Sequence, residues 1–187
     1  MGIQPLPMLL SLLAAAAPLS EPQPMAEEPF QQWLLESDLQ QLELGCGDPL
    51  ISAGGGRRQQ IRDRLLVLHP APQSFDRVMA NASALLTCGS PDSAARVLNR
   101  ISPAQGEERR LWLRLRWQAA ASALDHREAA LALRRLVNGD LIALADLDLG
   151  DGRLGLDQLA LHEAALGRQD EAVGLLLLAP NPQRLAQ

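Results

Sequence analysis

Apolar side chains recur at helical spacing along most of the chain after residue 29. In the first such stretch, residues 30–43, Phe30 and Leu34 lie on one side, and Leu39 and Leu42 continue it. Apolar positions three and four residues apart fall on one face of an α-helix. The pattern therefore predicts an amphipathic helix over residues 30–43.

A second helix is predicted over residues 57–69. Ile61, Leu65 and Leu68 occupy positions i, i+4 and i+7, and the prolines that follow end the helix because they disrupt helical hydrogen bonding. A glycine-rich loop over about residues 45–56 separates it from the first helix.

Three helix pairs are then expected. In the first pair, Ser90 and Pro91 supply an N-cap residue and a first-turn proline. The predicted pairs are 74–88 with 90–101, 107–124 with 126–137, and 156–166 with 169–178, with a short helix over 141–146 before the last pair. No segment alternates apolar and polar residues as a half-buried strand does. The predicted fold class is therefore all-α, with essentially no sheet.

The turns of these three pairs share a sequence pattern. Each second helix carries an alanine five residues after the turn, at Ala94, Ala129 and Ala172, and a leucine four residues after the alanine. Small residues let the two helices of a pair approach closely, and the leucines fill the gap between neighbouring pairs.

The pattern resembles the tetratricopeptide repeat, a helix–turn–helix unit of about 34 residues. The turn, alanine and leucine positions of that family correspond to Gly89, Ala94 and Leu98, then Leu124, Ala129 and Leu133, then Gly167, Ala172 and Leu176. The resemblance covers about residues 73–180 and implies antiparallel helix pairs stacked as a short solenoid. Trp117 departs from it, because the family places a small residue there.

The resemblance also implies a binding surface. In such arrays the first helices line a concave face that takes a peptide or partner helix. The corresponding positions are Met79, Ser83, Arg114, Gln118, Asp157 and Leu161. Arg114 is the expected anchor, because a guanidinium can pair with a carboxylate through two hydrogen bonds.

Composition supports the helical class and adds an asymmetry of charge. Leucine and alanine, both strong helix formers, dominate the 47% hydrophobic fraction, and aromatic residues make up 3%. Residues 1–56 hold seven acidic residues and no basic one, whereas residues 57–187 hold 17 arginines and 15 acidic residues. An acidic leader can dock on a basic surface, but we expect a solvated leader here.

The expected organisation is a leader (1–29), an N-terminal helix pair (30–72), a repeat domain (73–180) and a tail (181–187).

Residues 6–17 form an uncharged apolar run that is too short to span a bilayer. Its length and the small residues at its end suit a signal peptide, but no basic residue precedes it and Pro18 follows it at once. A translation start at Met25 is a rival explanation. We expect a cytoplasmic protein without a membrane span, with export through a signal peptide as the alternative.

The chain has two cysteines, Cys46 and Cys88. Two are too few for a disulfide framework or a metal site. We expect buried free thiols, which pack as small apolar side chains, with a single bridge as the alternative.

Two loops suggest ligand chemistry at first sight. Residues 146–157 place aspartates as a calcium loop does, but Gly150 stands where an oxygen ligand is needed and Asp151 where glycine is needed. We expect a connector there, with Asp157 capping the next helix. Glycines 54–56 precede Arg57 but lack the Lys-Ser/Thr of a phosphate loop, so a hinge is expected.

The helix over 107–124 carries Arg110, Arg114 and Trp117 on one face, a pattern that can stack on and neutralise a nucleic acid. The isoelectric point of about 5.2 argues against that use, and Glu107 can pair with Arg110. We expect a peptide-contact or solvated face, and no nucleic-acid partner.

The histidines, His69, His126 and His162, have no partner at ligand spacing. We expect no catalytic or metal-binding residues and no cofactor. The predicted function is a non-catalytic module that binds another protein or a peptide on its concave face. The alternatives are a structural or assembly-helper subunit that docks through apolar helix faces, and an ion-binding protein or enzyme that uses the 146–157 loop.

Overall fold

The computed structural model describes residues 23–54, 56–69 and 72–179. Over these residues the chain forms ten α-helices, one 3₁₀ helix and no strand, apart from an isolated bridge between Asp148 and Leu154. The helices are α1 (Glu27–Glu36), α2 (Leu39–Gly47), α3 (Pro49–Ser52), α4 (Arg57–Val67), α5 (Phe75–Thr87), α6 (Pro91–Leu98), α7 (Glu107–Ser122), α8 (His126–Leu136), η1 (Leu141–Leu144), α9 (Gly155–Ala165) and α10 (Gln169–Leu178). The all-α fold class is confirmed.

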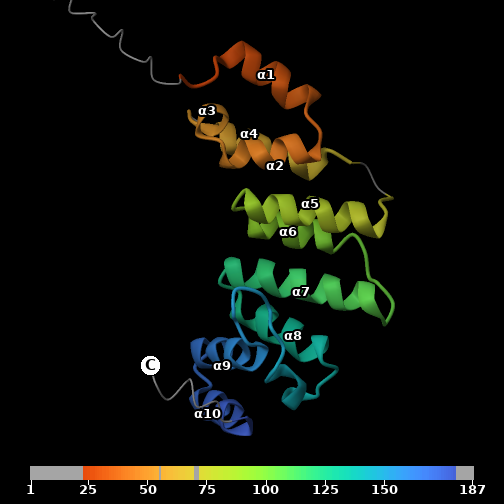
Figure 1. The fold of residues 1–187 in the computed structure, drawn as a ribbon, viewed down its shortest axis with the longest axis vertical. Coiled ribbons are helices and arrows are strands. Elements are labelled where there is room, and N and C mark those ends of the chain that lie inside the picture. Colours follow the sequence, from red (N-terminus) through yellow and green to blue (C-terminus); the bar gives the residue numbers. More distant parts are fainter. Residues whose placement is uncertain (1–22, 55, 70–71, 180–187) are drawn as a thin grey trace, which may run out of the picture.

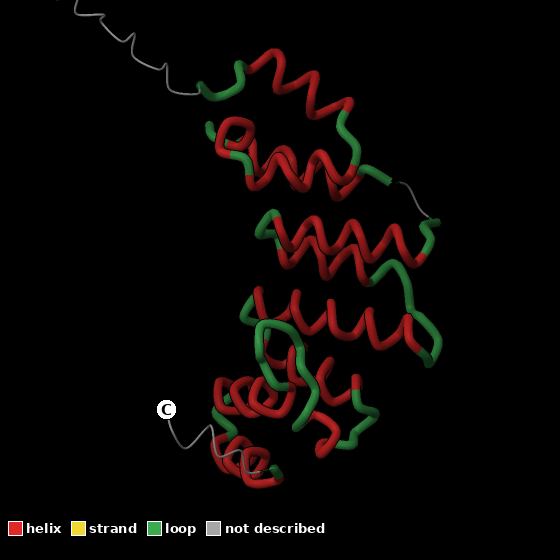
Figure 2. The backbone as a smooth tube through the Cα atoms, in the orientation of Figure 1, coloured by secondary structure: helices red, strands yellow, loops and turns green. Residues whose placement is uncertain are grey.

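The helices succeed one another along the longest axis of the molecule (Figure 1). From α5 onward each helix packs mainly against its neighbours in the chain, and α5 also contacts α7. The tube in Figure 2 shows short loops joining these helices, with a longer loop between α8 and α9. None of the helices in the described part of the chain is long and apolar enough to cross a membrane.

The three predicted turns have the same backbone structure. Gly89, Leu124 and Gly167 adopt left-handed conformations, with φ of 68°, 59° and 79°. The next residue donates its N–H to a carbonyl five residues back: Ser90 to Leu85 (2.8 Å), Asp125 to Ala120 (2.9 Å) and Arg168 to Glu163 (3.0 Å). This pattern satisfies carbonyls at a helix end and is the Schellman motif. The alignment of the three turns therefore holds in three dimensions.

The alanines that follow these turns are buried, as expected. Ala94 and Ala129 are fully buried, and Ala172 is 5% exposed. Leu98 and Leu133 are also fully buried, but Leu176 on α10 is 38% exposed. Leu176 differs because no described helix packs on the outer side of α10.

The single helix predicted over residues 30–43 is wrong, because the chain forms two helices there. Ser37 is extended, and Asp38 begins α2 with a capping box. The Asp38 carboxylate accepts the N–H of Gln41, and the Gln41 side chain accepts the N–H of Asp38, both at 2.9 Å. These bonds satisfy helix-start donors, which favours a new helix over a continuous one.

Two further local predictions need correction. Ser90 occupies the N-cap position of α6, but its side chain makes no capping hydrogen bond. Asp157 does not occupy the N-cap position of α9, which falls at Leu154, one residue before the helix begins at Gly155. A β-carbon at Gly155 would meet Leu144 Cδ2 at 2.9 Å, so glycine lets the start of α9 pack closely on η1.

The glycine loop before α4 leads into a fixed arginine. Arg57 is 7% exposed, and its guanidinium donates to the carbonyl of Met25 (2.6 Å) and to the carboxylate of Glu27 (3.0 Å). It also lies over the ring of Phe30, 4.5 Å from the centroid. Arg57 thus joins the start of α4 to Met25 and to the start of α1. The hinge expected at glycines 54–56 stays a prediction, because Gly55 lies outside the described residues.

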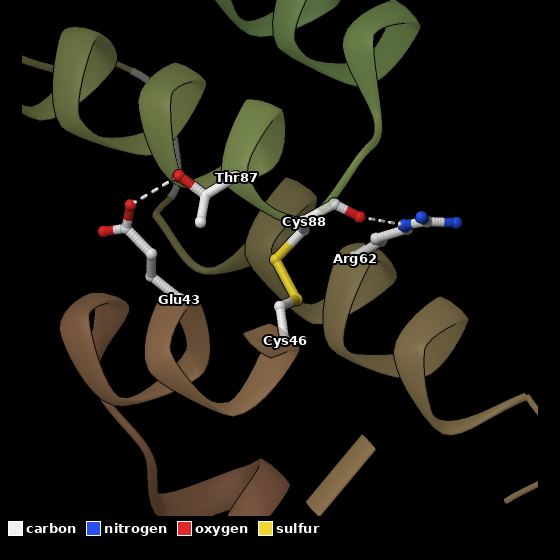
Figure 3. Close-up of a disulfide and its surroundings, with 5 residues drawn as sticks. All are labelled: Glu43, Cys46, Arg62, Thr87 and Cys88. Carbon is white, nitrogen blue, oxygen red and sulfur yellow. Dashed lines mark hydrogen bonds between the residues drawn. A yellow bond between two sulfur atoms is a disulfide. The ribbon is translucent and has the colours of Figure 1, made fainter. Parts of the chain in front are cut away.

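Cys46 and Cys88 form a disulfide, so the expectation of free thiols was wrong (Figure 3). Cys46 lies near the end of α2 and Cys88 follows the last residue of α5. On either side, Thr87 donates its hydroxyl to the Glu43 carboxylate (2.8 Å) and Arg62 donates to the Cys88 carbonyl (2.8 Å). The packing of α2 on α5 brings the sulfurs together, and that contact is not visible in the cysteine spacing.

Candidate peptide groove between α5 and α7

A cavity of about 440 Å³ lies between α5 and α7. It is lined by Phe75, Asp76, Met79, Ala80, Ser83, Leu111, Arg114, Leu115 and Gln118. The structure therefore brings together four of the six residues implied by the family resemblance, namely Met79, Ser83, Arg114 and Gln118. Its volume falls in the range of about 300–1,000 Å³ that is usual for binding clefts.

The groove is formed by the helix faces that the core leaves uncovered. On α5, Val78, Ala82 and Leu85 are fully buried, whereas Met79 is half-buried and Ser83 is exposed. Residues four apart share one side of a helix. The same amphipathic pattern that packs α5 therefore also aligns its groove residues.

Arg114 stands at the junction of two cavities. The second cavity, also about 440 Å³, is lined by Glu107, Arg110, Leu111, Arg114, Leu136, Val137, Ala143 and Leu147. The Arg114 guanidinium is exposed and donates one hydrogen bond, 3.0 Å long, to the carbonyl of Asp148. That bond orients the side chain and leaves most of its five N–H donors for a ligand.

Among the described residues, Arg114 is the one charged residue that lines both cavities. Arg110 is paired with Glu107 one turn earlier, as the sequence predicted. Asp76 lies in the α5 part of the first cavity, away from the second. Most other residues of the two linings are apolar, so a ligand that covers the exposed Arg114 would exclude water from it and strengthen its attraction for a carboxylate.

Asp157 and Leu161, the other two implied groove residues, line neither cavity. Residues of the long connection between α8 and α9, Ala143 and Leu147, line the second cavity, and Asp148 binds Arg114. This connection covers α7 where α9 would continue the groove of a regular array. Leu161 is 53% exposed on α9.

A buried polar cluster at the α7–α9 contact was missed by sequence reasoning. Trp117 is 1% exposed and donates its indole N–H to Nε2 of His162 (3.2 Å). Nδ1 of His162 lies 3.1 Å from Nδ1 of His126. Burial lowers the pKa of His162 to about 4, with a smaller contribution from His126. The available signal was Trp117 itself, a bulky side chain with a polar N–H at a position where the tetratricopeptide repeat, which the sequence resembles, has a small residue.

Next to this cluster, Glu163 is 1% exposed and forms ion pairs with Arg134 (2.9 Å) and Arg168 (2.8 Å). Burial opposes its ionisation, but the two arginines outweigh burial and hold the pKa of the carboxyl below its usual value. His162 and Glu163 therefore carry structural hydrogen bonds inside the protein. Neither lines the α5–α7 groove.

The 146–157 loop folds as a tight connector. The Asp148 carboxylate accepts the N–H of Gly150 (2.7 Å), and Leu149 donates to the Arg153 carbonyl (2.8 Å). Asp151 pairs with Arg153. Across the described ranges, no three histidine, cysteine or acidic side chains gather as metal ligands would.

The tryptophans of α7 point into the protein. Trp112 is 7% exposed and donates its indole N–H to the Leu98 carbonyl (3.0 Å), while Arg116 covers its ring at 4.7 Å. Arg153 lies 5.2 Å from the ring centroid of Trp117. The face of Arg110 and Arg114 therefore has no exposed tryptophan on which a base could stack.

Comparisons with known proteins identify no relative: the chain matches no protein-family model, no curated protein and no solved structure.

Proposed function

We propose that this chain is a non-catalytic protein-interaction module, built as a short tetratricopeptide-like solenoid, that binds a peptide in the groove between α5 and α7. The turns at Gly89, Leu124 and Gly167, which share one hydrogen-bond pattern, support the repeat architecture. The observation that carries the function is the position of Arg114, an oriented and exposed cation between two largely apolar cavities.

The lining defines the chemistry of the partner. Phe75, Met79 and Leu115 offer an apolar wall for a large aliphatic or aromatic side chain. Arg114 takes a carboxylate a short distance along the peptide, and Gln118 can bond the peptide backbone. The expected ligand is therefore an extended peptide or exposed helix turn with an apolar residue followed closely by an acidic one.

Selection from a library of random displayed peptides tests this proposal. The peptides that bind the purified protein are expected to share the apolar–acidic pattern. Arg114→Glu should weaken their affinity by about tenfold or more, as expected for loss of a charge-assisted hydrogen bond worth about 1.5–3 kcal/mol.

Arg127→Glu is the matched control, because Arg127 is exposed on α8 and lines neither cavity. It should leave the affinity unchanged, and both variants should keep the helical circular-dichroism signal of the parent. Loss of the exposed Arg114–Asp148 hydrogen bond should lower the melting temperature of Arg114→Glu only slightly. Equal affinity for the parent and Arg114→Glu would refute binding at this groove.

The second candidate function is an assembly subunit that docks through an apolar helix face. The observation in its favour is the outer face of α10, where Val173 is 55% and Leu177 71% exposed. Exposed apolar groups clustered on one face often mark a protein contact. Under this candidate, the Val173→Glu, Leu177→Glu double variant would no longer bind a partner that is isolated with the parent protein. The Arg114→Glu variant would still bind it.

A further inference from the structure

The disulfide between Cys46 and Cys88 is enclosed by the fold. The two residues are 3% and 2% exposed. In Figure 3 the bond lies between α2 and α5, with the Thr87–Glu43 hydrogen bond on one side and the Arg62–Cys88 hydrogen bond on the other. In the folded protein an enzyme or small thiol has no direct access to either sulfur.

Burial fixes when the bond forms. Disulfide formation requires a thiolate to attack an accessible disulfide of an oxidant, and access controls the rate. Cys46 and Cys88 are accessible only before α2 has closed on α5. The bond must therefore form while the chain folds, in the compartment where it folds.

The chemistry is a thiol–disulfide exchange with a dithiol oxidase in its disulfide form. The thiolate of one cysteine attacks the oxidant and forms a mixed disulfide, releasing one oxidant thiolate. The thiolate of the other cysteine then attacks the first cysteine's sulfur and releases the second oxidant thiolate. The chain loses two electrons and two protons, and the oxidant ends as a dithiol.

We propose that the chain folds in an oxidising, extracytoplasmic compartment, which it reaches by using the apolar run of residues 6–17 as an export signal. Disulfides persist in such compartments and are rare in the reducing cytosol. The run has the length of a signal-peptide core and ends in four alanines, Ala14 to Ala17. Those residues lie outside the described part of the chain, so only their sequence enters the argument. The disulfide thus favours export over the cytoplasmic location expected from the sequence.

The test uses the native protein from its own cells, lysed directly into denaturant with N-ethylmaleimide. Intact-mass measurement is expected to show no maleimide adduct and a mass lower by two hydrogens than that of the dithiol chain. The protein is expected in the extracytoplasmic fraction, with its first residue at or just after the alanines. Two maleimide adducts, or a disulfide-bonded protein in the cytosol, would overturn the proposal.

A pair of leucine variants makes the test specific to the apolar run. Leu10→Arg, in the middle of the run, should keep the chain in the cytosol with both thiols reactive. Leu19→Arg, outside the run, should be exported and oxidised like the parent. Pulse labelling reads both variants before a retained chain is degraded. Unchanged location and oxidation in Leu10→Arg would show that the run is not the signal.

Discussion

The indole nitrogen of Trp117 donates a hydrogen bond to Nε2 of His162, 3.2 Å away. An acceptor Nε2 places the proton of the neutral ring on Nδ1, which faces Nδ1 of His126. Protonating His162 would put a second hydrogen between the indole and the imidazole. The geometry therefore agrees with a pKa lowered by burial and by the nearby His126, which the carboxylate of Glu163 only partly opposes.

The first prediction is a loss of stability in mild acid. The pKa of His162 is about 4 in the folded protein, whereas the ordinary value of 6.5 applies to the unfolded chain. Between these two pH values the unfolded chain therefore binds more protons than the folded protein. The free energy of unfolding should therefore fall as the pH drops from 6.5 towards 4, by about 2–3 kcal/mol for this group. Urea titrations at a series of pH values measure it.

His162→Gln is the control for this window. Glutamine can still accept the Trp117 hydrogen bond but does not titrate, so the slope between pH 6.5 and 4.5 should flatten. Glu163 does not affect the slope in this range. Its pKa is lowered in the folded protein, so its contribution to the free energy of unfolding is lost only below pH 4.5. An unchanged slope in His162→Gln would assign the acid sensitivity to other groups.

The second prediction concerns the left-handed turn of the middle pair. Leu124 has φ of 59° and its side chain is 74% exposed, so it bears backbone strain without a packing benefit. Leu124→Gly should raise the free energy of unfolding by about 0.5–1 kcal/mol, after the entropy of glycine in the unfolded chain is counted. Gly167→Ala, where a β-carbon would meet nothing within 4 Å, should lower it by about 1 kcal/mol. Thermal unfolding of both variants measures these changes. A Gly167→Ala variant more stable than the parent would contradict the shared turn structure.

The third prediction tests the close approach of α7 and α8. Ala129 is fully buried, so Ala129→Leu should overpack this contact and cost about 1–3 kcal/mol. Arg135 is exposed on the same helix, and Arg135→Ala should change the stability by less than about 0.5 kcal/mol. Chemical denaturation compares them. Similar losses from both changes would show that Ala129 is not a close-packed position.

The fourth prediction concerns the disulfide and stability. Cys46 and Cys88 are 42 residues apart, and closing a loop of this length in the unfolded chain stabilises the fold by about 4 kcal/mol. The Cys46→Ala, Cys88→Ala double variant should lose most of this and should no longer respond to a reducing agent. Guanidinium unfolding of the parent with and without reductant provides the comparison. A reductant effect that persists in the double variant would have another origin.

Local sequence was enough to place most helices and the three turns at Gly89, Leu124 and Gly167. The Schellman turns at Gly89, Leu124 and Gly167 depend on residues within six positions of one another, so spacing alone reveals them. The break at Ser37 was hidden because apolar spacing continues across it, while the capping box of Asp38 decides the structure.

The groove was only partly predictable for a different reason. Met79 and Arg114 follow from the predicted repeat pattern, because that pattern makes α5 and α7 the first helices of neighbouring pairs. Asp157 and Leu161 do not, because the path of the long connection from α8 to α9 depends on contacts such as Arg114 with Asp148, 34 residues apart. The Cys46–Cys88 bond and the Trp117–His162 bond are likewise long-range contacts without a local signature.

The disulfide also sets how the molecule responds to force. A chain pulled from its two ends can extend only along the backbone that carries tension, and the cross-link diverts that tension across the sulfurs. The 42-residue span from Cys46 to Cys88 then carries no tension, so the stretched chain is shorter by about 140 Å of contour length than it would be without the disulfide. In a single-molecule stretching experiment, reduction should add that length to the fully extended chain, while α6 to α10 give the same increments as before.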